Sequence, residues 1–177
     1  MPETGSSTYA CVITGASRGI GKATAEVLTR RGATVVTLGR DTSRNTIACD
    51  LASFASIRAA AAAISARWPH IRLLVNNAGV QHLRRHETVD GVEETLAVNH
   101  LAPFLLTHLL MPNLRAAAPA RVVTVSSSLA RWGGIDFEDL TVPGVTTVDG
   151  ISQVGPEIWT AYFRDPDGNL LLLTQIG

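Results

Sequence analysis

The 177 residues are enough for one domain with a core of its own, since 46% of them are hydrophobic and 17% are charged. Lysine plus arginine and aspartate plus glutamate number 15 each, so the net charge gives no reason to expect binding to nucleic acid or to an anionic membrane. The longest apolar stretch, Leu101 to Met111, is too short to span a bilayer.

The amino-terminal segment MPETGSSTYA has neither a basic region nor a long apolar region, so no signal peptide is expected there. The two cysteines, Cys11 and Cys49, lie in apolar strand-like runs and form no CxxC pair. We therefore expect buried free thiols and a cytoplasmic location.

Apolar runs over residues 9–14 and 34–38 predict two buried strands, and residues 46–49 suggest a third. Between the first two runs, residues 22–31 predict a helix that Gly32 ends. Three apolar residues of this helix share a face: Ala23, Val27 and Leu28.

Four more elements are predicted further along the chain: helices over residues 54–68 and 91–117, and strands over residues 71–75 and 121–126. Ser53 is a typical cap for the first of these helices, and Pro103 is expected to bend the second. Strands and helices alternate with short connections, which predicts βαβ units and a parallel sheet. The expected fold is a truncated Rossmann-type doubly wound α/β fold, whose strand and helix pattern can be followed to about residue 130.

The composition changes after residue 131, where Gly, Pro, Asp and Thr become frequent. Two strand-like runs, residues 157–163 and 169–176, flank the sequence Asp165-Pro166-Asp167-Gly168, which suits a type I turn. We therefore expect a C-terminal β-hairpin, with a partial Rossmann domain over residues 1–141 and a hairpin tail over residues 142–177.

A glycine turn, TGASRGIG at residues 14–21, follows the first strand and opens the first helix. Gly15 permits the tight turn, Gly19 lets the backbone approach a pyrophosphate, and Gly21 lets the helix pack closely. Phosphates would meet the N–H groups at the helix amino terminus. Because strand and helix flank the glycines, this pattern predicts a dinucleotide site.

The residue that follows the second strand predicts which dinucleotide is bound. Arginine there accommodates the 2′-phosphate of NADP, whereas an acidic residue binds the ribose hydroxyl of NAD. Arg40 holds this position and Arg18 adds a second guanidinium, so we expect NADP(H). Asp41 follows immediately and leaves NAD as a possible cofactor. Arg40 could instead be an ordinary solvated arginine.

Five segments in order resemble the short-chain dehydrogenase/reductase family: TGASRGIG, CDL at residues 49–51, NNAG at residues 76–79, VNH at residues 98–100, and RVVTVSSSLA at residues 121–130. The following WGGIDFEDL is similar to the retinol-dehydrogenase-like branch. The resemblance covers residues 8–141. It implies an oxidoreductase that moves a hydride between a nicotinamide cofactor and a carbonyl or alcohol substrate.

The resemblance also assigns roles to residues. Asp50 would contact the adenine, Asn99 would belong to a proton relay, and Ser127 would be the catalytic serine. The expected cofactor contacts are Gly15, Ser17, Arg18, Gly19, Ile20, Gly21, Arg40, Asp50, Leu51, Asn77, Ala78 and Gly79.

The chain departs from the family in two places. Only ten residues lead from Arg40 to Asp50, so the helix expected between them must be short or absent. The Tyr-x-x-x-Lys motif, the family's proton donor and its partner, is absent: Tyr162 has Pro166 four residues later, and Lys22 is the only lysine. We therefore expect weak catalysis or none, which leaves a non-catalytic nucleotide-binding or interaction protein as the alternative.

The tail carries a second resemblance. The segment AYFRDPDGNLLLLTQ at residues 161–175 resembles the last hairpin of glyoxalase/bleomycin-resistance (vicinal oxygen chelate) domains. Leu172 stands where those domains have a metal-binding glutamate, so a metalloenzyme is the weakest reading. His82 and His86 have the spacing of metal ligands on a helix but no evident third ligand, which favours a solvated polar segment.

The long helix suggests self-association. In the family, this helix and the next pack on a partner subunit, and the next one is absent here. Apolar residues on the helix at 92–116 would then need cover from the tail or from a second copy. They are Leu101, Phe104, Leu105, Leu109 and Leu110.

Overall fold

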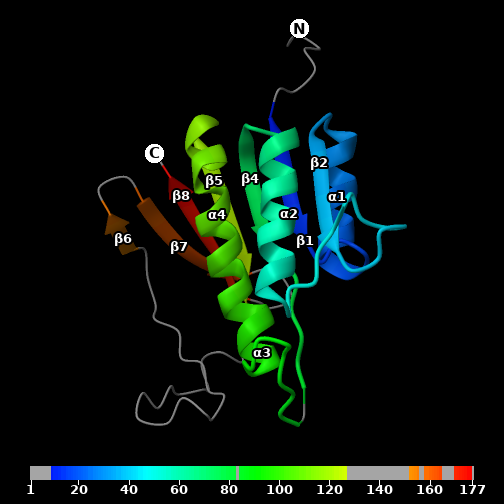
Figure 1. Ribbon diagram of the computed structural model, residues 1–177. Helices are drawn as coiled ribbons and strands as arrows, with labels where there is room; N and C mark the ends of the chain where they lie inside the picture. Colours follow the sequence, from blue (N-terminus) through cyan, green and yellow to red (C-terminus); the bar gives the residue numbers. More distant parts are fainter. Residues whose placement is uncertain (1–8, 83, 127–151, 156–157, 165–169, 177) are drawn as a thin grey trace, which may run out of the picture.

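The computed structural model describes residues 9–82, 84–126, 152–155, 158–164 and 170–176. One sheet runs through it in the strand order β3-β2-β1-β4-β5-β8-β7-β6, with helices on both faces (Figure 1). The first five strands are parallel, which confirms the predicted Rossmann-type fold. The parallel strands are β1 (Ala10–Thr14), β2 (Thr34–Gly39), β3 (Ile47–Ala48), β4 (Ile71–Asn76) and β5 (Ala120–Val125).

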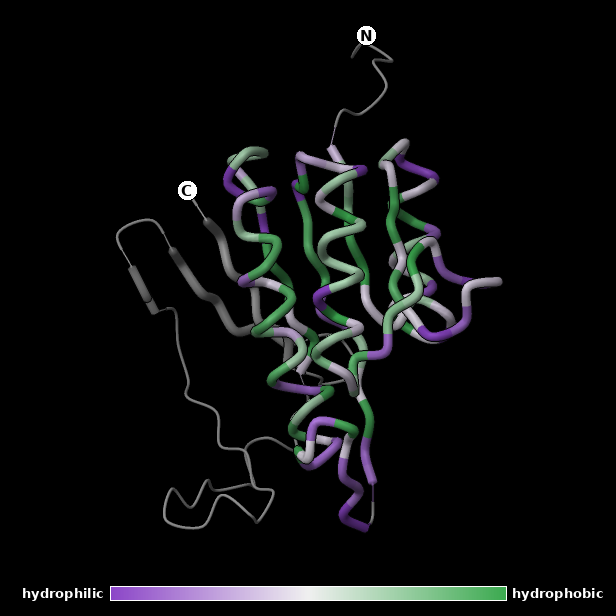
Figure 2. The backbone as a smooth tube through the Cα atoms, in the orientation of Figure 1, coloured by the Kyte–Doolittle hydropathy of each residue, from purple (hydrophilic) through white to green (hydrophobic). Residues whose placement is uncertain are grey.

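The helices are α1 (Gly19–Arg30), α2 (Phe54–Arg67), α3 (Glu94–Leu96), the π-helical turn η1 (Ala97–Leu101) and α4 (Ala102–Ala116). Both α2 and α4 cover one face of the sheet and form the larger core. Ile57 and Ile64 of α2 and Leu106 and Leu110 of α4 are fully buried there. Helical spacing lines up each pair, and burial of each side chain contributes about 1.5–3 kcal/mol. Figure 2 shows that hydrophobic residues predominate along the parallel strands.

The opposite face of the sheet carries α1, whose contact stripe differs from the predicted one. Ala25 and Leu28 pack on the sheet, and Gly21 is the buried glycine of the helix. Val27, placed on the inner face by the sequence, is 38% exposed, and Ala23 is exposed as well. The helix begins at Gly19, earlier than expected, and the positions on its sheet-facing side, 21, 25 and 28, have helical spacing.

The predicted long helix over residues 91–117 begins later than expected. Gly91 has φ +72° and belongs to a turn, and helical structure starts at Glu94. The Glu93 carboxylate caps it, accepting hydrogen bonds from the N–H groups of Thr95 (2.9 Å) and Leu96 (2.7 Å). The disturbance expected near Pro103 is η1, which lies immediately before it and is closed by a bond from the Ala102 N–H to the Ala97 carbonyl.

The predicted C-terminal hairpin is confirmed as β7 (Ile158–Arg164) and β8 (Leu170–Ile176), which pair antiparallel. A further strand, β6 (Ser152–Gly155), pairs with β7 and was not predicted. Strand β8 also pairs antiparallel with β5, so the hairpin extends the sheet at the β5 edge (Figure 1). The division into two domains, 1–141 and 142–177, remains a prediction.

The apolar face expected on the long helix is divided by the fold. Leu110 is fully buried, and Leu101, Leu105 and Leu109 are half-buried, whereas Phe104 is 70% exposed. Self-association through this helix stays a prediction, with Phe104 as its most exposed apolar residue. In the part of the chain that the structure describes, no helix has the length and apolar character needed to cross a membrane.

Candidate functional site

The residues singled out by the sequence follow the carboxyl ends of the parallel strands, at the lower edge of the sheet in Figure 1. The glycine turn follows β1, Arg40 follows β2, Asp50 follows β3 and residues 77–79 follow β4. In open α/β sheets, ligands bind at this edge. Ser127, the expected catalytic serine, lies outside the described residues.

Positive φ angles in the glycine turn explain two of its glycines. Gly15 has φ +68° and Gly19 has φ +56°, a conformation that other residues rarely adopt. A Cβ on Gly15 would lie 2.8 Å from the Cα of Ala78, and a Cβ on Gly21 would collide with the Asn77 side chain. A Cβ on Gly19 would meet no atom within 4 Å, so this glycine faces open space. Gly15 and Gly21 serve packing inside the protein, and Gly19 leaves room outside it.

Thr14 joins the glycine turn to the segment after β4, and sequence reasoning missed this role. Its buried Oγ1 accepts hydrogen bonds from the N–H groups of Asn77 and Ala78, both at 3.0 Å. The same hydroxyl donates to the Val75 carbonyl at 3.5 Å. A hydroxyl residue at the end of a buried strand, directly before the glycine turn, was the available signal.

The Asn77 side chain strengthens the same junction. Its Nδ2 donates to the carbonyls of Thr14 (3.0 Å) and Gly15 (3.1 Å). The neighbouring Asn76 is buried and donates to the Thr107 and Thr124 hydroxyls at 3.2 and 3.5 Å, which ties β4 to α4 and β5. The two asparagines therefore connect the end of β4 to the glycine turn, to α4 and to β5.

Asn99 fastens the next segment of the chain. Its Nδ2 donates to the Val80 carbonyl and its Oδ1 accepts from the Val80 N–H, both at 2.8 Å. The amide thus makes one donated and one accepted hydrogen bond with the backbone of Val80, and Asn99 lies in the π-helical turn η1. π-Helical turns are frequent at functional sites. In this structure the side chain positions the residues that follow NNAG.

The amino terminus of α1 is open to an anion. Arg18 at its N-cap makes no side-chain cap, and the first turn has no acidic residue, whereas Ser53 caps α2 and Glu93 caps α3. Ser17, Arg18 and Ile20 are exposed, and Ile20 is an apolar side chain at 49% exposure. Free N–H groups and the helix dipole favour negative charge here.

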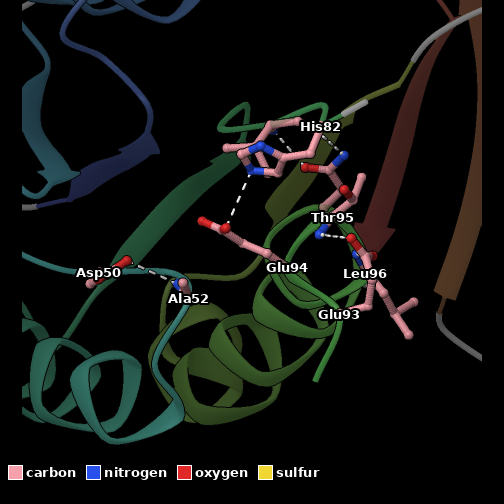
Figure 3. Close-up of polar contacts among 9 residues, drawn as sticks. Asp50, Ala52, His82, Glu93, Glu94, Thr95 and Leu96 are labelled. Atoms are coloured by element: carbon pink, nitrogen blue, oxygen red, sulfur yellow. Dashed lines mark hydrogen bonds and ion pairs between the residues drawn. The ribbon is translucent and has the colours of Figure 1, made fainter. Parts of the chain in front are cut away.

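Arg40 and Asp50 follow β2 and β3, the two strands that lie beyond β1 at one end of the sheet. Arg40 is exposed at the end of β2, and Asp50 is exposed at the end of β3, next to half-buried Leu51. The Asp50 carboxylate accepts a hydrogen bond from the Ala52 N–H at 3.0 Å (Figure 3). Burial raises the pKa of the neighbouring Cys49 to about 11, so this thiol stays protonated at neutral pH.

A histidine pair lies in the loop after β4, which is not the helix that its spacing allowed. The rings of His82 and His86 lie 4.6 Å apart between centroids, and the His82 Nε2 lies 3.3 Å from a Glu94 carboxylate oxygen (Figure 3). His82 and His86 are both exposed, as expected of a solvated polar segment, and His82 in addition faces Glu94. Among the described residues, no group of three or more His, Cys, Asp or Glu side chains could hold a metal ion.

Neither Tyr9 nor Lys22 stands in for the missing Tyr-x-x-x-Lys pair. Tyr9 precedes β1, at the amino-terminal edge of the sheet, where its ring meets His70 and the Arg72 guanidinium. Lys22 lies in α1 and forms an exposed ion pair of 3.8 Å with Glu26. The two side chains thus belong to different ends of the sheet. At the carboxyl edge of the sheet, the uncapped amino terminus of α1 favours negative charge, and the described residues hold no such proton-donating pair.

Comparisons with known proteins agree with this architecture. The family model for short chain dehydrogenase matches residues 9–138. Dehydrogenase/reductase SDR family member 13 from Bos taurus is 44% identical over 76% of this chain and 40% of its own length. Retinol dehydrogenase 12 from Bos taurus is 44% identical over 73% of this chain and 46% of its own length. The chain thus spans less than half the length of these curated relatives.

Solved structures of known proteins are also similar to this chain in fold. A metagenomic short-chain oxidoreductase in complex with NADP is 32% identical, with a TM-score of 0.61 over 70% of this chain and 64% of that one. The 3-alpha-hydroxysteroid dehydrogenase from Pseudomonas sp. B-0831, complexed with NADH, is 30% identical, with a TM-score of 0.61 over 68% of this chain and 45% of that one.

The family match ends at residue 138, before the C-terminal hairpin, so it lends no support to the glyoxalase resemblance of that hairpin. The five sequence segments, by contrast, all lie within the matched residues. On the match over residues 9–138 and the parallel sheet with its glycine turn, this chain belongs to the short-chain dehydrogenase/reductase family.

Proposed function

We propose that this chain binds a nicotinamide dinucleotide at the carboxyl edge of its sheet, prefers NADP(H), and has impaired turnover. The observation that carries the proposal is the glycine turn held by Thr14 and Asn77, beside an uncapped amino terminus of α1. Such a turn is already built for a pyrophosphate, so little ordering accompanies binding. The likeness to an oxidoreductase in complex with NADP supports this proposal.

The expected contacts divide by the part of the cofactor. The pyrophosphate would lie over Gly19 and the first N–H groups of α1, and Arg18 and Arg40 would flank the 2′-phosphate. Asp50 would meet the adenine. The remaining contacts follow the family resemblance: Gly15, Ser17, Ile20, Gly21, Leu51, Asn77, Ala78 and Gly79.

The bound nicotinamide would supply or accept a hydride, and the substrate would be a carbonyl or an alcohol. Ser127 would polarise the carbonyl oxygen of the substrate. Asn99 would position the residues that follow NNAG through its hydrogen bonds with Val80. General acid–base catalysis typically contributes about 10²–10⁴-fold, and these 177 residues contain no Tyr-x-x-x-Lys motif to supply it. Turnover by this chain is therefore expected to be slow.

Calorimetric titration of the purified chain tests cofactor binding. We expect NADPH to bind more tightly than NADH, and Arg40→Ala to weaken NADPH binding about tenfold, because hydrogen bonds to charged groups are worth about 1.5–3 kcal/mol. Binding of NADH should change less than twofold. Failure of the unaltered chain to bind either dinucleotide would refute the proposal.

A non-catalytic nucleotide-binding protein is the second candidate, favoured by the position of Lys22 in an ion pair within α1. It predicts no NADPH oxidation with aldehyde substrates above the rate without protein, even when NADPH binds. The measurement is the loss of NADPH absorbance with a panel of aldehydes. Steady oxidation that disappears in Ser127→Ala would exclude this candidate and support a working oxidoreductase.

A further inference from the structure

The segment between β2 and β3, residues 40–46, is short and closely held; we refer to it as the β2–β3 loop. The two strands pair only at Leu38 with Ile47 and at Gly39 with Ala48. The chain therefore leaves the end of β2 and returns beside it within seven residues, with no helix between. This loop starts next to the glycine turn, because the Gly15 N–H donates to the Leu38 carbonyl at 3.1 Å.

Hydrogen bonds hold the β2–β3 loop in one shape. The hydroxyl oxygens of Thr37 and Thr46 each accept the other residue's N–H, at 3.0 and 3.3 Å. The Asn45 Nδ2 donates to the Asp41 carbonyl at 2.8 Å. Asn45 is buried against Gly39, where a Cβ would lie 2.6 Å from that nitrogen. The backbone that carries the side chains of this loop is thus held in one conformation.

The Asp41 carboxylate is occupied within the loop. Its Oδ1 accepts from the Ser43 N–H at 2.9 Å and the Ser43 hydroxyl at 2.6 Å, and its Oδ2 lies 3.4 Å from the Arg44 Nε. The Ser43 hydrogen bonds, with a smaller contribution from Arg44, lower the pKa of this carboxyl. A carboxylate that selects NAD must accept hydrogen bonds from the ribose hydroxyls. Asp41 already accepts two hydrogen bonds from Ser43 and pairs with Arg44, so it is poorly placed for that task.

Arg44 lines an open cleft of about 730 Å³ between α1 and β2. The cleft reaches the glycine turn at Ala16 and Ser17 and includes Thr37 of β2. Three cationic side chains line it, Lys22, Arg30 and Arg44, against the single carboxylate of Glu26. The charged side chains that line the cleft are therefore net positive.

We propose that Arg44 is a specificity-determining residue, which binds the 2′-phosphate of NADP(H) together with Arg40. The proposal rests on the proposed dinucleotide site. Asp41 holds the Nε edge of the guanidinium and so leaves its two terminal nitrogens for a phosphate, which guanidinium binds in bidentate fashion. From the sequence, Asp41 left NAD as a possible cofactor. In the fold it instead positions Arg44 for binding of NADP(H).

The test uses 2′,5′-ADP and 5′-AMP, two probes that differ by the phosphate in question, titrated calorimetrically into the full chain. We expect Arg44→Ala to weaken 2′,5′-ADP binding about tenfold and to change 5′-AMP binding less than twofold. Arg44→Lys keeps the charge without the planar fork and should recover part of the loss. Arg58→Ala removes an exposed arginine from α2, on the other face of the sheet, and should change neither affinity.

The outcomes separate the two proposals. Equal 2′,5′-ADP affinities in Arg44→Ala and Arg58→Ala would overturn the role of Arg44 and leave the dinucleotide site standing. A parallel loss of both probes in Arg44→Ala would also overturn it, because the effect would then not be specific to the 2′-phosphate. Failure of the unaltered chain to bind either probe would overturn both proposals together.

Discussion

Gly15→Ala is expected to destabilise the protein by about 2–5 kcal/mol. A non-glycine residue at φ +68° costs about 1–2 kcal/mol, and overpacking of a tight site typically costs about 1–3 kcal/mol more. The added Cβ would lie 2.8 Å from the Cα of Ala78, and backbone cannot move aside as a flexible side chain can. The free energy of unfolding in urea measures the loss.

Gly32→Ala is the matched control for this prediction. Gly32 also has a positive φ, +83°, but a Cβ there would meet no atom within 4 Å. This variant should show the conformational cost alone, about 1–2 kcal/mol. Equal losses in the two variants would mean that the close approach of Ala78 to the glycine turn does not constrain residue 15.

Thr14→Val is expected to destabilise the protein by about 2–4 kcal/mol and to weaken dinucleotide binding. Valine has nearly the same shape as threonine but removes the acceptor for the N–H groups of Asn77 and Ala78. An unsatisfied buried donor costs about 1–3 kcal/mol. Urea unfolding gives the stability, and hydrogen exchange at amides 77 and 78 reports locally on the lost bonds.

Thr14→Ser separates the hydroxyl from the methyl group. Serine keeps the Oγ acceptor and removes one methyl, so the expected loss is about 1 kcal/mol, with amides 77 and 78 still protected. If serine and valine were equally damaging, packing of the methyl group would be the dominant contribution of Thr14, and its role as the acceptor for the segment after β4 would be wrong.

The sequence alone was sufficient for the parallel part of the fold. Apolar runs of strand length alternate with helical spacings, and this local pattern located β1, β2, β4 and β5 and the helices between them. It was also sufficient for the glycine turn, because positive φ angles leave glycine as the default residue. Ser53 as the cap of α2 followed from the same local rules, since a cap is chosen by its immediate neighbours.

Contacts between distant segments could be decided only by the tertiary structure. Thr14 and Ala78 are 64 positions apart, and although the hydroxyl at the end of a buried strand was a local signal, nothing local identifies Ala78 as its hydrogen-bond partner. The same holds for Asn99 with Val80, and for the pairing of the C-terminal β8 with β5, which depends on which sheet edge is open. The sequence identified Arg40 and Asp41 as opposing signals for the cofactor. Only the folded β2–β3 loop showed that Asp41 is taken up by Ser43 and Arg44, because hydrogen-bond partners are set by the path of the chain in space.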